Sequence, residues 1–132
     1  MLDKLGLASA IEWQGSEFKK RTGIKCKLEI ENIEDLEGNI PISLFRIFQA
    51  SLTNIMLHSK ATSVSVKLAV INGILQLKVI DNGIGITQEQ INSRRSLGII
   101  GIRERAKQIN GKLDIHTQKN KGTEIMVTVP LK

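Results

Sequence analysis

The sequence predicts an α+β fold: a two-layer sandwich in which a mixed, mostly antiparallel sheet of about five strands is covered on one face by about three helices. Several segments alternate apolar and polar residues, which is the period of a half-buried strand. Most of these segments come in pairs joined by short turns, so the strands are expected to pair antiparallel and the helices to cover one face only. The chain of 132 residues has no repeat and no linker-like stretch, which indicates one domain over residues 1–132.

The N-terminal part is expected to hold two long helices and one strand. Residues 3–21 place apolar side chains near helical spacing, and Thr22-Gly23 gives a stop signal. Residues 24–30 alternate between apolar and charged side chains, as a half-buried strand does. Pro41 suits the first turn of a second helix that runs to about His58. The apolar stripe of this helix is expected to contain Phe45, Phe48, Leu52, Ile55 and Met56.

The C-terminal part is expected to form two hairpins separated by a short helix. Asn72-Gly73 is a strong two-residue hairpin signal, and the hairpin that it joins leads directly to Asp81. Residues 101–109 read as the short helix, which Asn110-Gly111 ends. The four strands of the two hairpins are expected over residues 64–70, 75–79, 112–117 and 123–129.

The net charge of +6 is unevenly distributed, because from Arg94 onward nine Lys or Arg residues face only three acids. A basic surplus suits a phosphate-bearing ligand, a nucleic acid or an acidic lipid, and it equally suits a solvated basic face. One Trp, three Phe and no Tyr are available to stack on bases. Since no nucleic-acid motif is found either, we expect no nucleic-acid partner.

Cys26 is the single cysteine, which excludes an internal disulfide and zinc-binding spacing and favours a reducing compartment. Residues 1–14 lack the basic leader and the apolar core of a signal peptide. No apolar run approaches the roughly 18 residues that a membrane span needs. We therefore expect a cytoplasmic domain without direct membrane contact.

The most informative motif is Asp81-Asn82-Gly83-Ile84-Gly85-Ile86, with Asn54 on a helix before it and Gly98-Ile99-Ile100-Gly101 after it. An aspartate that accepts a hydrogen bond from a purine amine, an asparagine for a metal and glycines for close backbone approach would together form a nucleotide site. Taken alone, Asp-Asn-Gly is more typical of an ordinary turn. The common phosphate-binding loop and the dinucleotide fingerprint are both absent from the sequence.

Four segments, together with LDKLGLASAIEWQ at the start, resemble the ATP-binding catalytic domain of sensor histidine kinases, and more narrowly the branch that pairs with LuxR/NarL-type response regulators. These segments are FRIFQASLTNIMLHSKATSV, DNGIGI, SLGIIGIRERAKQINGKLDI and KGTEIMVTVPL. The resemblance implies a Bergerat-type ATP-binding fold that uses ATP and Mg²⁺. It also implies that the dimerisation and phosphoacceptor helices lie upstream of Met1, that the intact protein is a homodimer, which can be membrane-anchored, and that this fragment alone is monomeric.

The resemblance also assigns a role to each motif residue. Asp81 would accept a hydrogen bond from the adenine amine, with Thr123 nearby, and Asn54 would bind Mg²⁺ through its carbonyl oxygen. His58, one helical turn later, would contact phosphate; an ordinary surface histidine is the alternative. The glycines would let the backbone approach the nucleotide and hinge a mobile lid over residues 87–97, which includes Arg94 and Arg95; plain structural turns are the alternative for Gly83, Gly85, Gly98 and Gly101.

Three positions depart from the family pattern. Ala50 stands where a glutamate is usual, Leu57 where a Lys or Arg is common, and Ser96 where a glycine usually opens the second glycine box. No catalytic base is therefore assigned. Neither His58 nor His116 resembles an exposed phosphoacceptor, so the acceptor histidine is expected upstream. A catalytically impaired nucleotide-sensing or partner-binding module is the alternative function, and a stand-alone serine kinase that binds a sigma factor is a more distant one.

Overall fold

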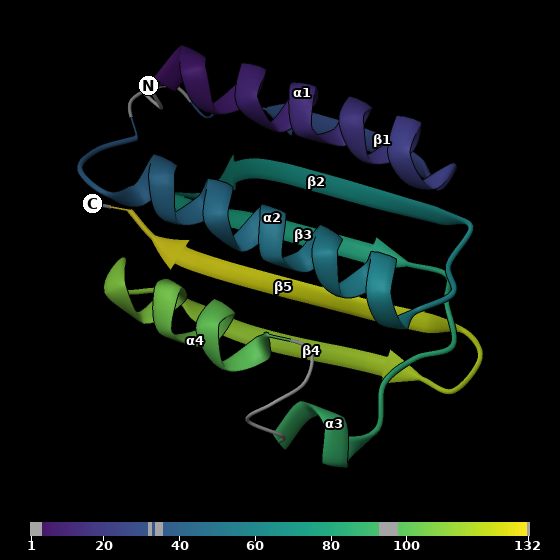
Figure 1. The fold of residues 1–132 in the computed structure, drawn as a ribbon. Coiled ribbons are helices and arrows are strands. Elements are labelled where there is room, and N and C mark those ends of the chain that lie inside the picture. Colours follow the sequence, from purple (N-terminus) through teal and green to yellow (C-terminus); the bar gives the residue numbers. More distant parts are fainter. Residues whose placement is uncertain (1–3, 32, 34–35, 93–97, 132) are drawn as a thin grey trace.

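The computed structural model describes residues 4–31, 33, 36–92 and 98–131. Apart from one additional short helix, α3 (Gln88–Asn92), the helices and strands follow the predicted order (Figure 1). The elements are α1 (Lys4–Thr22), β1 (Lys25–Glu31), α2 (Ile40–His58), β2 (Ser63–Ile71), β3 (Ile74–Asp81), α3 (Gln88–Asn92), α4 (Ile99–Gln108), β4 (Lys112–Gln118) and β5 (Gly122–Pro130).

The five strands form one mixed sheet in the order β1-β2-β3-β5-β4. β1 pairs parallel with β2, whereas the three other pairings are antiparallel. The predicted mixed, mostly antiparallel sheet is therefore confirmed. Because β3 and β5 lie side by side in the centre, Asp81 at the end of β3 is paired with Thr123 near the start of β5.

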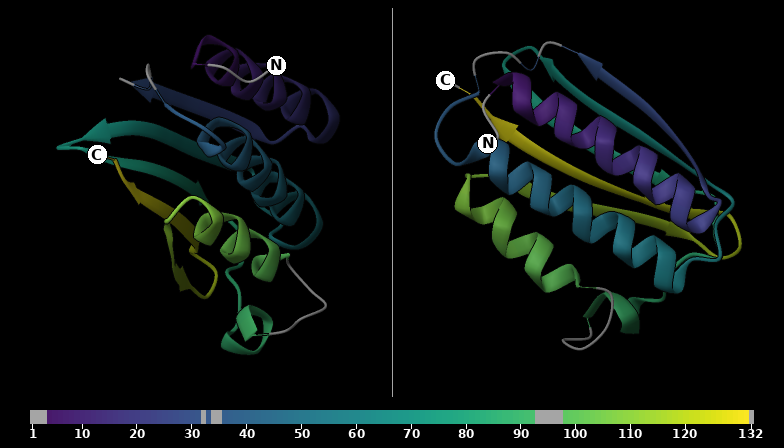
Figure 2. Two further views of the ribbon diagram at one scale, coloured as in Figure 1. Left: turned by 90° about the vertical axis from the view of Figure 1, so that its left-hand side faces the viewer. Right: turned by 45° about the horizontal axis from the view of Figure 1, so that its top comes forward.

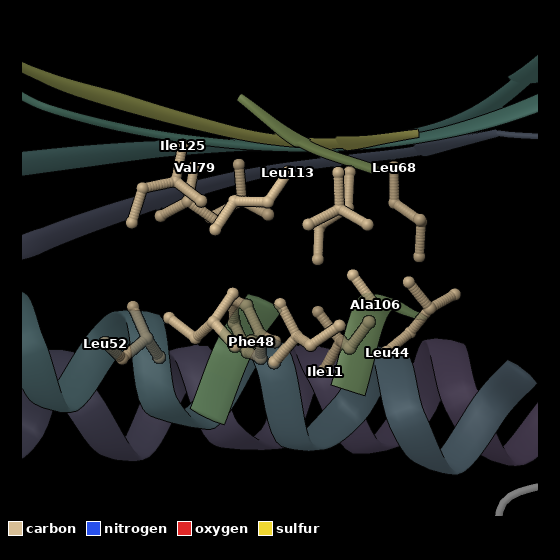
Figure 3. Close-up of a cluster of buried hydrophobic side chains, with 14 of the residues drawn as sticks. Ile11, Leu44, Phe48, Leu52, Leu68, Val79, Ala106, Leu113 and Ile125 are labelled. Atoms are coloured by element: carbon tan, nitrogen blue, oxygen red, sulfur yellow. The ribbon is translucent and has the colours of Figure 1, made fainter. Parts of the chain in front are cut away.

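Three long helices, α1, α2 and α4, form a single layer on one face of the sheet, with α2 in the middle (Figures 1 and 2). The core lies between this layer and the sheet, as Figure 3 shows for Phe48 and Leu52 of α2 opposite Val79 and Ile125. Within the part of the chain that the structure describes, no helix covers the other face of the sheet (Figure 2). The predicted two-layer sandwich is confirmed, with one short helix, α3, in addition to the three that cover the sheet (Figure 1).

Helix α2 is apolar because it is the core helix. Its length and mean hydropathy of 1.3 would also fit a membrane-spanning helix, but its apolar side chains pack on the sheet and on both neighbouring helices. Phe48, Leu52 and Ile55 lie in the buried stripe as predicted, and Phe45 is half-buried, whereas Met56 is exposed. Met56 follows Ile55 directly, so it is turned about 100° away from the stripe.

One boundary and one helix differ from the sequence prediction. α4 begins at Ile99 rather than at Gly101, so Gly101 lies inside its first turn. α3 falls within residues 87–97, the segment expected to form a lid. The remainder of that predicted lid, residues 93–97 with Arg94, Arg95 and Ser96, lies outside the described residues.

Candidate functional site

Asp81 is a buried acid at the end of a core strand. The alternation that buries Leu75, Leu77 and Val79 also turns Asp81 toward the helices, where it is only 7% exposed. Its Oδ1 accepts a hydrogen bond of 2.8 Å from the backbone N–H of Gly83. Burial raises the pKa of this carboxyl above its usual value, and backbone hydrogen bonds from Gly83 and Thr123 partly offset the rise. The carboxyl is therefore a fixed hydrogen-bond acceptor in a largely apolar environment.

Asn54 on α2 has an unpaired, buried carbonyl oxygen. Among the described residues, its Oδ1 is the one buried side-chain oxygen or nitrogen without a hydrogen-bond partner. Such an orphan is costly unless a ligand satisfies it. An amide oxygen is a hard ligand of the kind that Mg²⁺ prefers, so this atom fits the predicted metal role chemically.

Asn54, His58, Asp81 and Thr123 line one crevice between α2 and the sheet. The crevice is narrow, about 10 Å³, and its remaining walls are mostly apolar. Ile86 lines this crevice and also a larger cavity of about 540 Å³ beside the loop after β3. Four residues from three separate segments of the chain, α2, β3 and β5, which the family resemblance assigned to one site, therefore line the same crevice.

Gly83 allows the loop after β3 to lie directly against the end of α2. A Cβ at this position would clash with the backbone carbonyl of Ser59. The neighbouring Ile84 N–H donates a 2.8 Å hydrogen bond to the same carbonyl. The glycine is thus needed for space, and the contact holds the Asp81 loop against the helix that carries Asn54.

Gly85 allows a second close approach, to the turn between β4 and β5. Its φ of +83° lies in the left-handed region, and a Cβ there would lie 2.8 Å from the carbonyl oxygen of Gln118. Ile84 accepts a hydrogen bond from the Asn120 N–H, and the Ile86 N–H donates to Thr117 Oγ1 at 2.9 Å. The loop of residues 82–86, called the glycine loop below, is therefore held on one side by Ser59 at the end of α2 and on the other by β4 and the turn that follows it.

Gly98 and Gly101 lie elsewhere, at the beginning of α4. Gly98 is the N-cap residue with φ of +60°, and Gly101 faces the guanidinium group of Arg105. Neither glycine is among the residues that line the narrow crevice or the larger cavity. Their predicted contact with phosphate therefore stays a prediction, based on the free N–H groups of a helix start.

Gly122 and Thr117 belong to the same region but were not among the predicted site residues. Gly122 has a φ of +117°, and a Cβ there would clash with the backbone carbonyl of Asp81. Thr117 contacts both the glycine loop and Thr123. Gly122 could have been suspected from the Lys-Gly-Thr sequence, but the role of Thr117 depends on strand register, which the sequence does not reveal.

The two unusual positions on α2 have different environments. Ala50, one turn before Asn54, is half-buried and packs against the core. Leu57 is 63% exposed, although it is a large apolar residue. The helix therefore presents a methyl group and an isobutyl group where the family resemblance leads one to expect a carboxylate and a cation.

Comparison with known proteins gives consistent matches. The model of the family described as "Histidine kinase-, DNA gyrase B-, and HSP90-like ATPase" matches residues 39–132. The sensor histidine kinase LiaS of Bacillus subtilis is 37% identical over 130 residues, which cover 98% of this chain and 36% of LiaS. The signal transduction histidine-protein kinase/phosphatase DegS of Brevibacillus brevis is 33% identical, with 98% and 34% covered. The chain thus spans about a third of the length of these relatives.

Solved structures share the fold. The histidine kinase domain of the blue-light activated kinase EL346 from Erythrobacter litoralis matches with a TM-score of 0.78 at 19% identity, covering 98% of this chain and 64% of that one. The histidine kinase AdeS of Acinetobacter baumannii matches with a TM-score of 0.80 at 13% identity, covering 100% and 67%. At such identities the likeness concerns the fold alone.

Proposed function

Because this chain belongs to the family of histidine kinase-, DNA gyrase B- and HSP90-like ATPases, we propose that it binds ATP with Mg²⁺ as the catalytic domain of a histidine kinase. In the intact protein, the γ-phosphoryl group would pass to a histidine on an upstream dimerisation domain, and then to a LuxR/NarL-type response regulator. The observation that carries the proposal is the crevice that joins Asp81 and Thr123 to Asn54 and His58.

Adenine recognition is the role proposed for the sheet side of the crevice. The carboxylate of Asp81 is buried and held by the Gly83 N–H, so it can accept a hydrogen bond from the exocyclic amine without reorganising. The crevice of about 10 Å³ is too narrow for a purine ring, so it would have to widen on binding, and Val79, Ile86 and Ile125 would then contact the faces of the ring. A buried acceptor of this kind disfavours a base that presents a carbonyl oxygen in the same place, because two acceptors would then face each other.

Phosphate and metal binding is the role proposed for the helix side. Asn54 would hold Mg²⁺ through its unpaired Oδ1, and His58 would approach the phosphates from one turn further along α2. The bound metal supplies positive charge that neutralises the triphosphate and the charge that develops during transfer. Gly98 and the first N–H groups of α4 would add favourable dipoles for phosphate oxygens.

Isothermal calorimetry with Mg²⁺-ATP tests the proposal. We expect binding with a Kd of about 1 mM or lower, equivalent to about −4 kcal/mol or better. Asp81→Asn should weaken ATP binding by about tenfold or more, since it replaces a charged acceptor. The matched control Asp114→Asn changes an acid on β4 outside the crevice and should leave affinity unchanged. A folded chain that binds no ATP at millimolar concentration would overturn the proposal.

The metal role of Asn54 has a separate test. Asn54→Leu removes the unpaired buried oxygen and keeps the side-chain size, so the variant should unfold at the same or a higher urea concentration than the native chain. The same variant should lose the increase in ATP affinity that Mg²⁺ provides over EDTA. An unchanged Mg²⁺ effect would show that Asn54 does not hold the metal.

A catalytically impaired nucleotide-sensing or partner-binding module is the second candidate, and Ala50 is the observation that favours it. If the usual glutamate serves as a base or orients the reacting groups, its loss costs roughly 10²–10⁴ in rate and leaves adenine binding intact. Joining this chain to its upstream helices and measuring labelled phosphohistidine separates the two candidates. Strong labelling supports the active kinase, whereas labelling only after Ala50→Glu supports the impaired module.

Assembly and location follow the same proposal. The upstream helices would carry the phosphoacceptor histidine and the homodimer contact, with this domain in the cytoplasm and its parent protein free to be membrane-anchored. Sedimentation of this chain alone should then give a monomer. A stable dimer of the isolated chain would contradict that arrangement.

A further inference from the structure

Thr117 connects the glycine loop to the base of the crevice through one hydroxyl group. It lies on β4, opposite Thr123 of β5. Its Oγ1 accepts a hydrogen bond of 2.9 Å from the backbone N–H of Ile86. It also lies 3.0 Å from Thr123 Oγ1 and 3.3 Å from the carbonyl oxygen of Gly122. Three groups from two segments therefore converge on this atom.

Each threonine hydroxyl has only one hydrogen, and this limits which of Thr117 and Thr123 can donate to the other. A threonine hydroxyl donates one hydrogen bond and accepts two. If Thr123 donates to Thr117, then Thr117 can accept from both Thr123 and Ile86 and donate its own hydrogen to Gly122. In the opposite direction, the hydrogen of Thr123 has no partner among the described residues, although this side chain is only 6% exposed. Because buried donors are rarely left unpaired, the first direction is favoured.

This direction sets what Thr123 offers to a ligand. The hydroxyl hydrogen of Thr123 is donated to Thr117, so toward the crevice this hydroxyl presents only lone pairs and can act only as an acceptor. Asp81, paired with Thr123 across the two central strands, presents a second acceptor to the same crevice. Two neighbouring acceptors suit an amino group, which has two hydrogens, and oppose a carbonyl oxygen.

We propose that Thr117 is a positioning residue which fixes Thr123 as a hydrogen-bond acceptor and thereby helps the crevice select a 6-aminopurine nucleotide over a 6-oxopurine nucleotide. This inference rests on the proposed ATP-binding function and adds a determinant of base selectivity to it. Thr117 lines the larger cavity but not the narrow crevice, so it would act on a base held in the crevice through Thr123. Without the Thr117 hydroxyl, the hydrogen of Thr123 is free to turn toward the ligand and to donate to a carbonyl oxygen.

The test compares the affinities of ATP and inosine triphosphate, both with Mg²⁺, by calorimetry. Thr117→Val keeps the side-chain shape and removes the hydroxyl, and it should lower the ATP-to-inosine-triphosphate affinity ratio by about tenfold, or about 1.4 kcal/mol. Thr117→Ser restores a hydroxyl and should restore the ratio. In a Thr123→Val background, Thr117→Val should change the ratio no further, because the group on which Thr117 acts is gone.

The outcomes distinguish this inference from the function on which it rests. A native chain that binds neither nucleotide overturns both. A native chain that prefers ATP, together with a Thr117→Val variant that binds ATP with the native ratio, overturns the role of Thr117 alone. If both nucleotides weaken equally in Thr117→Val, Thr117 is structural and the inference fails. Should Thr117→Val not fold, Thr117→Ala provides the same comparison.

Discussion

Strand β3 is flanked by two Asn-Gly dipeptides that have different structural roles. At its start, Asn72 and Gly73 both have positive φ, at +52° and +77°, as the tight turn of a two-residue hairpin requires. A Cβ on Gly73 would meet no atom within 4 Å. At this end of the strand, the dipeptide is needed for its backbone conformation and not for space.

At the other end of β3, Asn82 and Gly83 are not in the left-handed region. Asn82 Oδ1 accepts hydrogen bonds from the N–H groups of Thr62 and Ser63, and its Nδ2 donates to Thr62 Oγ1. Gly83 leaves room for the carbonyl of Ser59. In the hairpin, asparagine and glycine are therefore needed because they adopt a positive φ. Beside the crevice, the asparagine is needed for its side-chain hydrogen bonds and the glycine because no larger residue fits against Ser59.

The largest expected difference between the two turns comes from glycine to alanine substitution. Gly83→Ala would force a methyl group into the Ser59 carbonyl, so we expect a loss of about 3 kcal/mol or more in the free energy of unfolding, together with weaker ATP binding. Gly73→Ala should cost about 1–2 kcal/mol, the strain of a left-handed non-glycine residue, with ATP binding unchanged. Urea unfolding measures both. Equal losses at the two sites would show that space at Ser59 is not the reason for Gly83.

The contrast between the turns also explains what the sequence could reveal. Asn72-Gly73 acts locally, so the hairpin and the alternating strands around it could be predicted from neighbouring residues. Asp81 and Asn54 were found because the resemblance links motifs that are distant in sequence. The close approach of Gly122 to Asp81 depends on how β5 is aligned with β3. Sequence periodicity carries no information on such a register between distant strands, and α3 is too short for a periodic signal.

An intermediate effect is expected when each asparagine is replaced by glycine. Asn82→Gly removes an acceptor of two backbone N–H groups and should cost about 1–2 kcal/mol in the free energy of unfolding. Asn72→Gly keeps the positive φ that the turn needs, so it should change that free energy by less than about 0.5 kcal/mol. Chemical denaturation of the two variants provides the measurement, and a larger loss for Asn72→Gly would reverse our assignment of the two roles.

The smallest effect concerns Asp81, the buried residue that precedes Asn82-Gly83. The residue at the matching position before Asn72-Gly73 is the exposed Ile71, which does not titrate. Burial raises the pKa of Asp81 above 3.8, so the folded chain holds this proton more tightly than the unfolded chain does. The resulting stabilisation is fully present below about pH 3.8 and is lost as the pH rises through the raised pKa. At neutral pH, the ionised carboxylate keeps its desolvation cost. The Asp81→Asn amide carries no charge and does not titrate. Unfolding curves measured from pH 7 to pH 3.5 should therefore show that the free energy of unfolding of the native chain, minus that of Asp81→Asn, increases as the pH falls. A difference that moves in the opposite direction would mean that the hydrogen bonds to the carboxylate outweigh its burial, and that Asp81 is held ionised at no cost to the fold.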